Sequence, residues 1–280
     1  MEIKGLSDDN ILKISHIKEE DEWALKYRID SYHNFLKLGL PDFGPKIELD
    51  FDNIIYYKSR QESEIKNNWN DINCSVKNEL DNLGVLESEK HLDGIGVQYE
   101  SEVIYHNMLS ELEEKNVIFT SIEVAMKKYP ELVKKYFGKI VSNNENKFAA
   151  LNGAVFSGGS FIYIPPNTTL DRPLQSYFRI NSRNMGQFER TLIIVDDNSH
   201  LHYVEGCTAP TYSDSSLHAA VVEIYVGKNS SCRYSTIQNW APNVYNLVTK
   251  RALVDENGVM EWIDGNIGSR LTMKYPCCVL

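Results

Sequence analysis

The sequence lacks any apolar run that approaches the roughly 18 residues of a membrane-spanning helix, and its first residues are charged and amphipathic. We therefore expect neither a membrane span nor a secretory signal. The sequence also lacks an excess of positive charge, because 39 acidic residues outnumber 29 basic ones and give a net charge of −10. Such a field repels phosphate backbones, so nucleic acid is not an expected partner.

Cysteine is scarce, and no C-x-x-C pair or Walker-type G-x-x-x-x-G-K-[ST] motif occurs. We therefore expect no ATP binding by this chain. The five cysteines form an odd set in a chain that is long enough to fold without disulfides. We interpret them as thiols and expect a soluble protein of the cytosol or of an equivalent reducing compartment, such as an organelle stroma. They are Cys74, Cys207, Cys232, Cys277 and Cys278.

Helical patterns dominate the first part of the chain. Leu25, Ile29, Tyr32 and Leu36 recur at helical spacing and predict an amphipathic helix, followed by an extended segment and a short strand. We predict two further helices over residues 101–115 and 122–137. The second should be capped by Thr120, kinked or split at Pro130 and stopped at Gly138.

After residue 150 the pattern changes to short β-branched and aromatic runs separated by Gly, Asn and Asp. Asn167, Asn198, Asn229 and Asn257 mark equivalent turns at spacings of 31, 31 and 28 residues. A near-constant repeat of strands and turns is typical of a solenoid. An antiparallel sandwich remains the alternative, but it does not by itself predict such regular turns.

These patterns predict an α+β protein with a small α-rich N-terminal domain followed by a β-helix. The polar run SNNENK suggests a linker, so we place the α-rich domain at residues 1–147 and the β-helix core at residues 148–280.

Long segments of the chain, among them NKFAALNGAVFSGGSFIYIP, VEGCTAPTYSDSSLHAAVVE and MEWIDGNIGSRLTMKYP, resemble the SufB branch of the SufB/SufD family of iron–sulfur cluster assembly scaffolds. The resemblance implies a right-handed parallel β-helix. It also implies a scaffold of the SUF system rather than an enzyme, one that accepts persulfide sulfur and supports assembly of a nascent cluster. The implied partners are the ATPase SufC, the paralogue SufD and a cysteine desulfurase with its sulfur carrier.

In this family the cysteine of EGC-[ST]-AP is taken as the sulfur acceptor, and here it is Cys207. The residues around it suggest a turn rather than a strand interior, which would leave the thiol reachable. The alternative is a small buried hydrophobic residue. Further residues in matching segments could line a sulfur path or merely pair locally; they are Arg179, Asn181, Gln238, Trp240 and Lys250.

Metal ligands are harder to assign. His202 and His218 flank Cys207, but their spacing matches no standard metal motif, and half-buried histidines are the simpler interpretation. We expect Cys74 and Cys232 to be structural. Cys277 and Cys278 are adjacent, so in a strand their side chains would point to opposite faces and could not both bind one ion without a turn. Glu205 and Glu223 should face solvent.

This sequence also departs from the family it resembles. Family members continue beyond the segment KYPCCVL with further rungs, which carry the main cluster ligands, and with a helical domain, which contacts SufC. Cluster binding by this chain alone is therefore in doubt, and we expect an open solenoid end to favour self-association. The alternative function is a structural or interaction module that no longer binds a cluster. A carbohydrate-active β-helix is a weaker alternative, because no carboxylate cluster occurs in the repeats.

Overall fold

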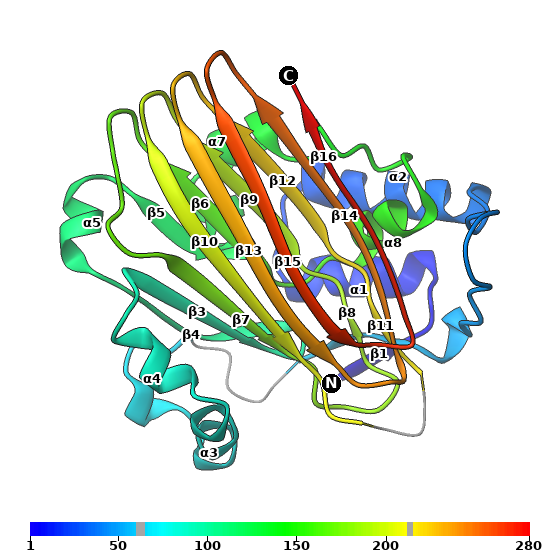
Figure 1. The fold of residues 1–280 in the computed structure, drawn as a ribbon. Helices are drawn as coiled ribbons and strands as arrows, with labels where there is room; N and C mark the ends of the chain where they lie inside the picture. Colours follow the sequence, from blue (N-terminus) through cyan, green and yellow to red (C-terminus); the bar gives the residue numbers. More distant parts are fainter. Residues whose placement is uncertain (60–64, 212–214) are drawn as a thin grey trace.

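In the computed structural model, which describes residues 1–59, 65–211 and 215–280, helices flank a stack of parallel strands that form a β-solenoid (Figure 1). The α+β prediction is confirmed. The helices all lie in the first 155 residues: α1 (Asp8–Ile17), α2 (Glu22–Lys37), α3 (Cys74–Asn82), α4 (Val85–Glu89), α5 (Ser110–Glu114), α6 (Ile122–Lys128), α7 (Pro130–Tyr136) and α8 (Lys147–Val155), with short 3-10 turns η1 (Phe51–Asn53) and η2 (Trp69–Asp71).

Two sheets form the walls of the solenoid. The six-stranded sheet has the order β15-β13-β10-β7-β3-β4, and the larger sheet has the order β5-β6-β9-β12-β14-β11-β8, with β16 paired to β14. The pairs between solenoid strands are parallel. The six-stranded sheet comprises β3 (Gly94–Tyr99), β4 (Glu102–Met108), β7 (Leu174–Arg179), β10 (His200–Thr208), β13 (Ser231–Trp240) and β15 (Val259–Gly268).

The larger sheet comprises β5 (Ile118–Ser121), β6 (Ser160–Ile164), β8 (Gly186–Gln187), β9 (Arg190–Val195), β11 (Ser216–His218), β12 (Val221–Val226) and β14 (Val244–Val254), joined by β16 (Leu271–Val279). A separate antiparallel pair joins β1 (Glu2–Lys4) to β2 (Ile55–Lys58). The antiparallel strands β4 and β5 extend the two walls at the end nearer the N-terminal half.

The repeated asparagines lie at the turns, as the sequence predicts. All four have φ between 54° and 59°, a left-handed conformation that asparagine tolerates better than most residues. Their side-chain amides form a ladder, since Asn198 Nδ2 donates to Asn167 Oδ1 at 3.3 Å and Asn229 Nδ2 to Asn198 Oδ1 at 3.2 Å. Asn257 continues the ladder at 3.1 Å. The turns stack along one edge of the molecule (Figure 1), so the solenoid is confirmed over the sandwich.

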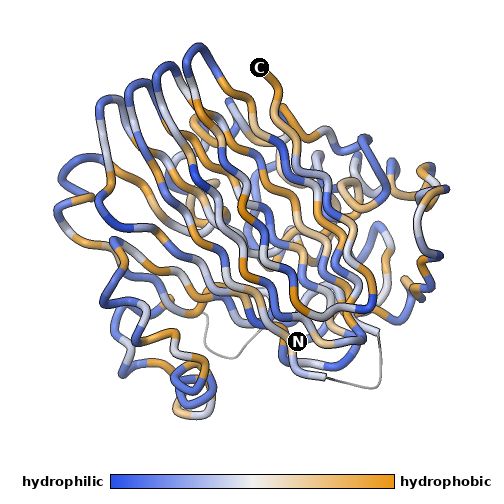
Figure 2. The backbone as a smooth tube through the Cα atoms, viewed as in Figure 1, coloured by the Kyte–Doolittle hydropathy of each residue, from blue (hydrophilic) through white to orange (hydrophobic). Residues whose placement is uncertain are grey.

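The inward residues of both walls form an apolar core. Tyr203 on β10 and Tyr234 on β13 lie in it with ring centroids 5.2 Å apart, and Ile224 on β12 closes it from the opposite wall. Figure 2 shows the alternation of apolar and polar residues along the strands that this arrangement requires. The inner layer therefore buries whatever polar groups the sequence places at inward positions.

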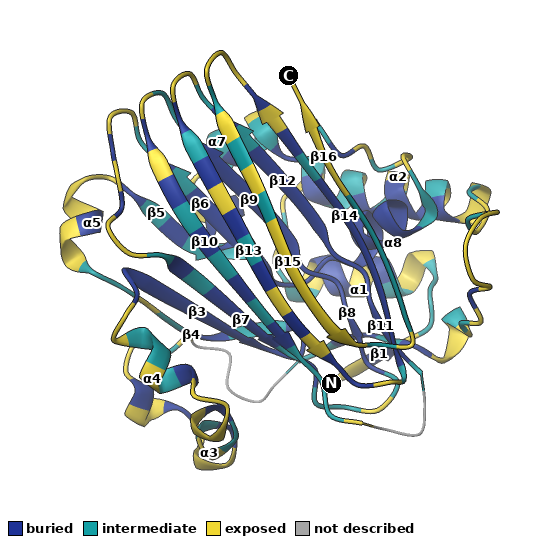
Figure 3. Ribbon diagram, in the orientation of Figure 1, coloured by how far each residue is buried: buried dark blue, intermediate teal, exposed yellow. Residues whose placement is uncertain are grey.

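Helices cover the outer faces of the walls. α1, α2 and α8 pack on β11 and β14, α6 and α7 on β6 and β9, and α3 and α4 on β3. Burial is deepest in the central strands and falls away along β15 (Figure 3). The described residues contain no helix that is both long and apolar enough to cross a membrane.

Several local predictions were wrong. Residues 101–115 form β4 and the short α5 rather than one helix, because pairing with β3 favours an extended chain. Helix α8 was missed, since residues 148–155 are all buried and show no amphipathic period. The predicted break at Pro130 and the stop at Gly138 (φ 70°) are confirmed, but the cap of α6 is Ser121, not Thr120.

The proposed division at residue 147 stays a prediction. The six-stranded wall takes β3 and β4 from the first range and its other strands from the second, so the two ranges share one sheet.

Candidate functional site

Cys207 lies inside strand β10 and not in the predicted turn. It pairs with Phe178 of β7 on one side and Gln238 of β13 on the other, and its side chain is fully buried. The neighbouring Gly206 suggested a turn, but its role is packing. A Cβ at this position would lie 2.9 Å from the ring of Tyr177, so only glycine fits against that ring.

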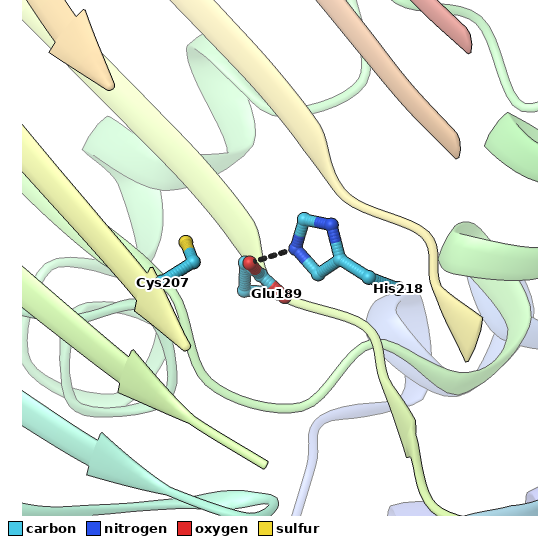
Figure 4. A group of neighbouring side chains, drawn as sticks. All are labelled: Glu189, Cys207 and His218. Carbon is cyan, nitrogen blue, oxygen red and sulfur yellow. Dashed lines mark hydrogen bonds and ion pairs between the residues drawn. The ribbon is translucent and has the colours of Figure 1, made fainter. Parts of the chain in front are cut away.

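Cys207 faces Glu189 and His218 across the interior (Figure 4). One ligand-type atom of each side chain lies within 4.8 Å of the other two, and all three residues are buried. The three come from different parts of the solenoid. Glu189 immediately precedes β9, Cys207 is on β10 of the opposite wall, and His218 ends β11.

A chain of hydrogen bonds with a defined direction runs from His218 to Cys207. Gln238 Nε2 donates to Cys207 Sγ at 3.7 Å, and Asn246 Nδ2 donates to Gln238 Oε1 at 2.8 Å. Since the Asn246 amide nitrogen is used in this way, its Oδ1, 2.7 Å from His218 Nδ1, accepts from that ring nitrogen. The other ring nitrogen, Nε2, pairs with the Glu189 carboxylate.

Charge and burial set the protonation of this group. Burial, reinforced by the negative charges of Glu205 and Glu189, raises the pKa of the Cys207 thiol well above its ordinary value. Burial alone would lower the pKa of His218, but the Glu189 carboxylate and the hydrogen bonds raise it. Burial therefore favours the protonated thiol of Cys207, and the neighbouring carboxylate favours the protonated ring of His218.

Glu205 holds the other side of Cys207. The thiol donates to Glu205 Oε1 at 3.6 Å, and Tyr234 donates to Glu205 Oε2. Glu205 is 2% exposed and Glu223 is 0% exposed, so the prediction that both face solvent was wrong. Glu205 points into the interior, whereas Glu223 points to the outer face of β12 and is covered by the segment that follows α7. Each of these carboxylates is satisfied by buried donors.

The predicted path residues divide into two groups. Gln238 contacts the Cys207 sulfur, and Trp240 packs in the same cluster, with its ring centroid 4.8 Å from that of His218. Arg179 instead lies on the outer face, where its Nε donates to Glu79 at 2.8 Å, and Asn181 donates to Tyr99. The structure therefore separates these last two from Cys207.

Lys250 is buried deeper along the interior. Its Nζ donates to Thr236 Oγ1 at 2.7 Å and to Asp264 at 3.1 Å, and it lies 4.5 Å from the ring centroid of Tyr234. Lys274 shares the Asp264 carboxylate at 2.9 Å. Tyr234, which also reaches Glu205, connects this cationic group to the Cys207 site.

The other cysteines and His202 lie apart from the site. His202 bonds Ser235 at 3.0 Å on the outer side of β10. Cys232 is buried in the apolar core, and burial raises its pKa to about 12. Cys74, Cys277 and Cys278 are exposed. In the site-bearing motif, residues 212–214 lie outside the described residues.

Glu189 is the member of the site that sequence reasoning missed. It stands between Phe188, packed under the N-terminal helices, and Arg190, a buried cation, in a segment with no metal motif. Only the solenoid places it opposite Cys207, because the strands that hold the two residues belong to different walls. The asparagine repeat could have predicted which rung of the solenoid holds Glu189, but not that its side chain faces Cys207.

Comparison with known proteins identifies two matching family models. Residues 97–176 match the "SufBD protein N-terminal region", and residues 178–280 match the "SUF system FeS cluster assembly, SufBD core domain". The chain is 57% identical over 279 residues to iron–sulfur cluster assembly SufBD family proteins of Staphylococcus saprophyticus and of Staphylococcus aureus strain USA300. The match covers 99% of this chain and 60% of each relative, so the chain spans about three fifths of their length.

Proposed function

This chain belongs to the SufBD family of iron–sulfur cluster assembly proteins, and we propose that it is a SufB-type scaffold component that accepts sulfur on Cys207. One observation carries the choice of residue. Among the five cysteines, Cys207 alone receives a side-chain amide donor on its sulfur within the described part of the chain, from Gln238. Such a donor stabilises a thiolate or persulfide anion.

The transfer is a sulfur exchange without net oxidation. The Cys207 thiolate attacks the outer sulfur of a donor persulfide, the donor's sulfur–sulfur bond breaks, and the donor leaves as a thiolate. Cys207 then carries the persulfide. The proton of the resting thiol must leave first, and the Glu205 carboxylate at 3.6 Å is positioned to take it.

Burial imposes a condition on this step. Cys207 is 0% exposed, so a sulfur donor reaches it only when the surrounding rungs open locally or when a partner reshapes them. The Lys250, Asp264 and Lys274 group lies further along the same interior and offers cations to a sulfur anion moving through it. We propose Gln238, Trp240 and Lys250 as path residues, because the first two lie beside Cys207 and His218 and the third lies further along the interior. Arg179 and Asn181 would act only from the outer face.

The chain acts as a scaffold rather than as an enzyme in this proposal. The iron–sulfur cluster is its cargo, and ATP is handled by SufC, with SufD and a cysteine desulfurase system as the other partners, in the cytoplasm. Self-association through β15 and β16, the strands with exposed residues in Figure 3, is a further prediction.

A structural or interaction module is the second candidate. The raised pKa of the buried Cys207 thiol favours it, because such a thiol is inert until the site opens.

The two candidates separate in a sulfur-loading experiment. The purified chain is incubated with a desulfurase, its sulfur carrier and cysteine, and protein-bound persulfide is located by peptide mass spectrometry. Cys207→Ser should abolish the label, whereas Cys232→Ser, which changes an equally buried cysteine outside the site, should keep it. A folded chain that acquires no persulfide on Cys207 would favour the interaction module.

A further inference from the structure

We propose that Glu189, Cys207 and His218 form a binding site for a thiophilic divalent transition metal of the Zn²⁺ or Fe²⁺ class. A thiolate, an imidazole and a carboxylate form a ligand set that suits these ions, and three protein ligands leave a fourth position open. The ligand atoms already lie within 4.8 Å of one another in a buried interior. The site is a property of the chain itself and does not depend on sulfur transfer.

His218 is oriented as a metal-binding histidine. Its Nδ1–H donates to Asn246 Oδ1 at 2.7 Å, and Asn246 is fixed in this orientation by its own donation to Gln238. Such a hydrogen bond on the far ring nitrogen sets the tautomer and directs Nε2 at the ion. In this chain Nε2 points at Glu189, on the side where Cys207 lies (Figure 4).

Glu189 supplies a second, independent observation that points to a cation. Its Oε2 is buried and has no hydrogen-bond partner among the described residues, although the side chain is 0% exposed. A buried carboxylate oxygen without a donor is costly, and such atoms call for a specific explanation. A cation between Glu189 and Cys207 would satisfy this oxygen.

The charges of the ligand set favour a divalent ion. A thiolate and a carboxylate carry two negative charges and a neutral imidazole carries none, so a bound ion of charge +2 leaves the buried group electroneutral. Such a group adds no net charge to a low-dielectric interior.

Cobalt(II) absorption tests the site without any sulfur donor. The titration uses the full chain with Cys74, Cys277 and Cys278 changed to Ser, which removes the exposed thiols. We expect one Co²⁺ per chain with thiolate-to-cobalt charge-transfer absorption, displaced by Zn²⁺. Glu189→Gln and His218→Gln in this background should each weaken binding by about tenfold or more, and Cys207→Ser should remove the absorption.

Cys232 is the matched control, since it is as buried as Cys207 but lies in the apolar core. Cys232→Ser should leave the cobalt spectrum unchanged. Zn²⁺ should also slow alkylation of Cys207 more than that of Cys232 in the same sample, a measurement that needs no variant at the site itself. Absence of thiolate–cobalt absorption at saturating Co²⁺, absorption that survives Cys207→Ser, or equal protection of both cysteines would each overturn the proposal.

Discussion

Gln238 Nε2 lies 3.7 Å from Cys207 Sγ across the β10–β13 pair, and both side chains are fully buried. A charge-assisted hydrogen bond of this kind contributes about 1.5–3 kcal/mol to the anionic form of the sulfur. We therefore expect Gln238→Ala to slow persulfide formation on Cys207 by about tenfold or more. Gln238→Glu should slow it further, because a second carboxylate would disfavour the thiolate.

Asn239→Ala is the control for this prediction, since Asn239 is the next residue of β13 and is exposed. It should load sulfur at the unaltered rate. The measurement is the initial rate of persulfide formation at Cys207, followed by peptide mass spectrometry. Equal rates for Gln238→Ala and Asn239→Ala would show that the amide does not assist the sulfur.

Sequence reasoning identified Cys207, Gln238 and Trp240, which the structure brings together, but through a resemblance and not through geometry. It also selected Arg179, which lies on the outer face beside Glu79. Alternation along a strand distinguishes the two faces, yet it does not tell which face is the interior when helices bury the outer one as well. Glu189 was also missed, because it lies near Cys207 only where the two walls of the folded solenoid face each other.

A second buried ion pair joins Arg190 to Glu223 on the outer face of the larger sheet, under the segment that follows α7. The guanidinium lies 2.6 Å from the carboxylate with both side chains 0% exposed, and Glu223 also accepts from the backbone N–H groups of Gly138, Ile140 and Val141. Removing one partner leaves the other charge buried and unpaired. We expect Arg190→Met to lower the free energy of unfolding by about 3–5 kcal/mol in urea titrations.

The exposed pair Arg233 and Glu261 provides the comparison, with N–O separation 2.8 Å and each side chain about half exposed. Arg233→Met should change stability by less than about 1 kcal/mol. The double variant Arg190→Met with Glu223→Leu should recover part of the loss, because no buried charge remains alone. If the two single arginine variants were equally stable, the buried pair would have no special role.

The repeat of asparagine turns is the part of the fold that the sequence predicts most directly, because a left-handed turn residue is a local requirement. Asn198 has φ 56° and contributes to the ladder on both sides. We expect Asn198→Ala to destabilise the protein by about 1–2 kcal/mol through backbone strain and lost hydrogen bonds. Asn198→Gly should cost less, since glycine adopts this conformation freely.

Thermal and urea unfolding of both variants measure this difference. The order of the two unfolding free energies is more informative than their size. If Asn198→Ala were more stable than Asn198→Gly, the left-handed backbone would not be the source of the asparagine preference. The helix over residues 147–155 lacks an amphipathic period, because residues 148–155 are all buried, and its local signal is the N-cap Asn146 alone. Periodicity therefore does not distinguish it from a buried strand.

His106 gives the chain a predicted acid sensitivity away from the Cys207 site. Its ring packs on Phe119 with centroids 4.8 Å apart, its Nε2 has no hydrogen-bond partner among the described residues, and burial lowers its pKa to about 4. In the unfolded chain the value is about 6.5. The unfolded state therefore binds more protons between these values, so stability is complete above about pH 6.5 and declines toward pH 4.

The full shift corresponds to about 3 kcal/mol, and we expect roughly 2 kcal/mol because the half-buried ring retains some solvent. His106→Asn removes the titrating group, so its unfolding free energy should fall less steeply than that of the unaltered protein as the pH is lowered through this window. Urea titrations of both proteins at several pH values give the two slopes, and contributions from the shared carboxylates cancel in the difference. Parallel curves would assign the acid sensitivity to other groups, whereas curves that converge toward pH 4 would place it on this ring.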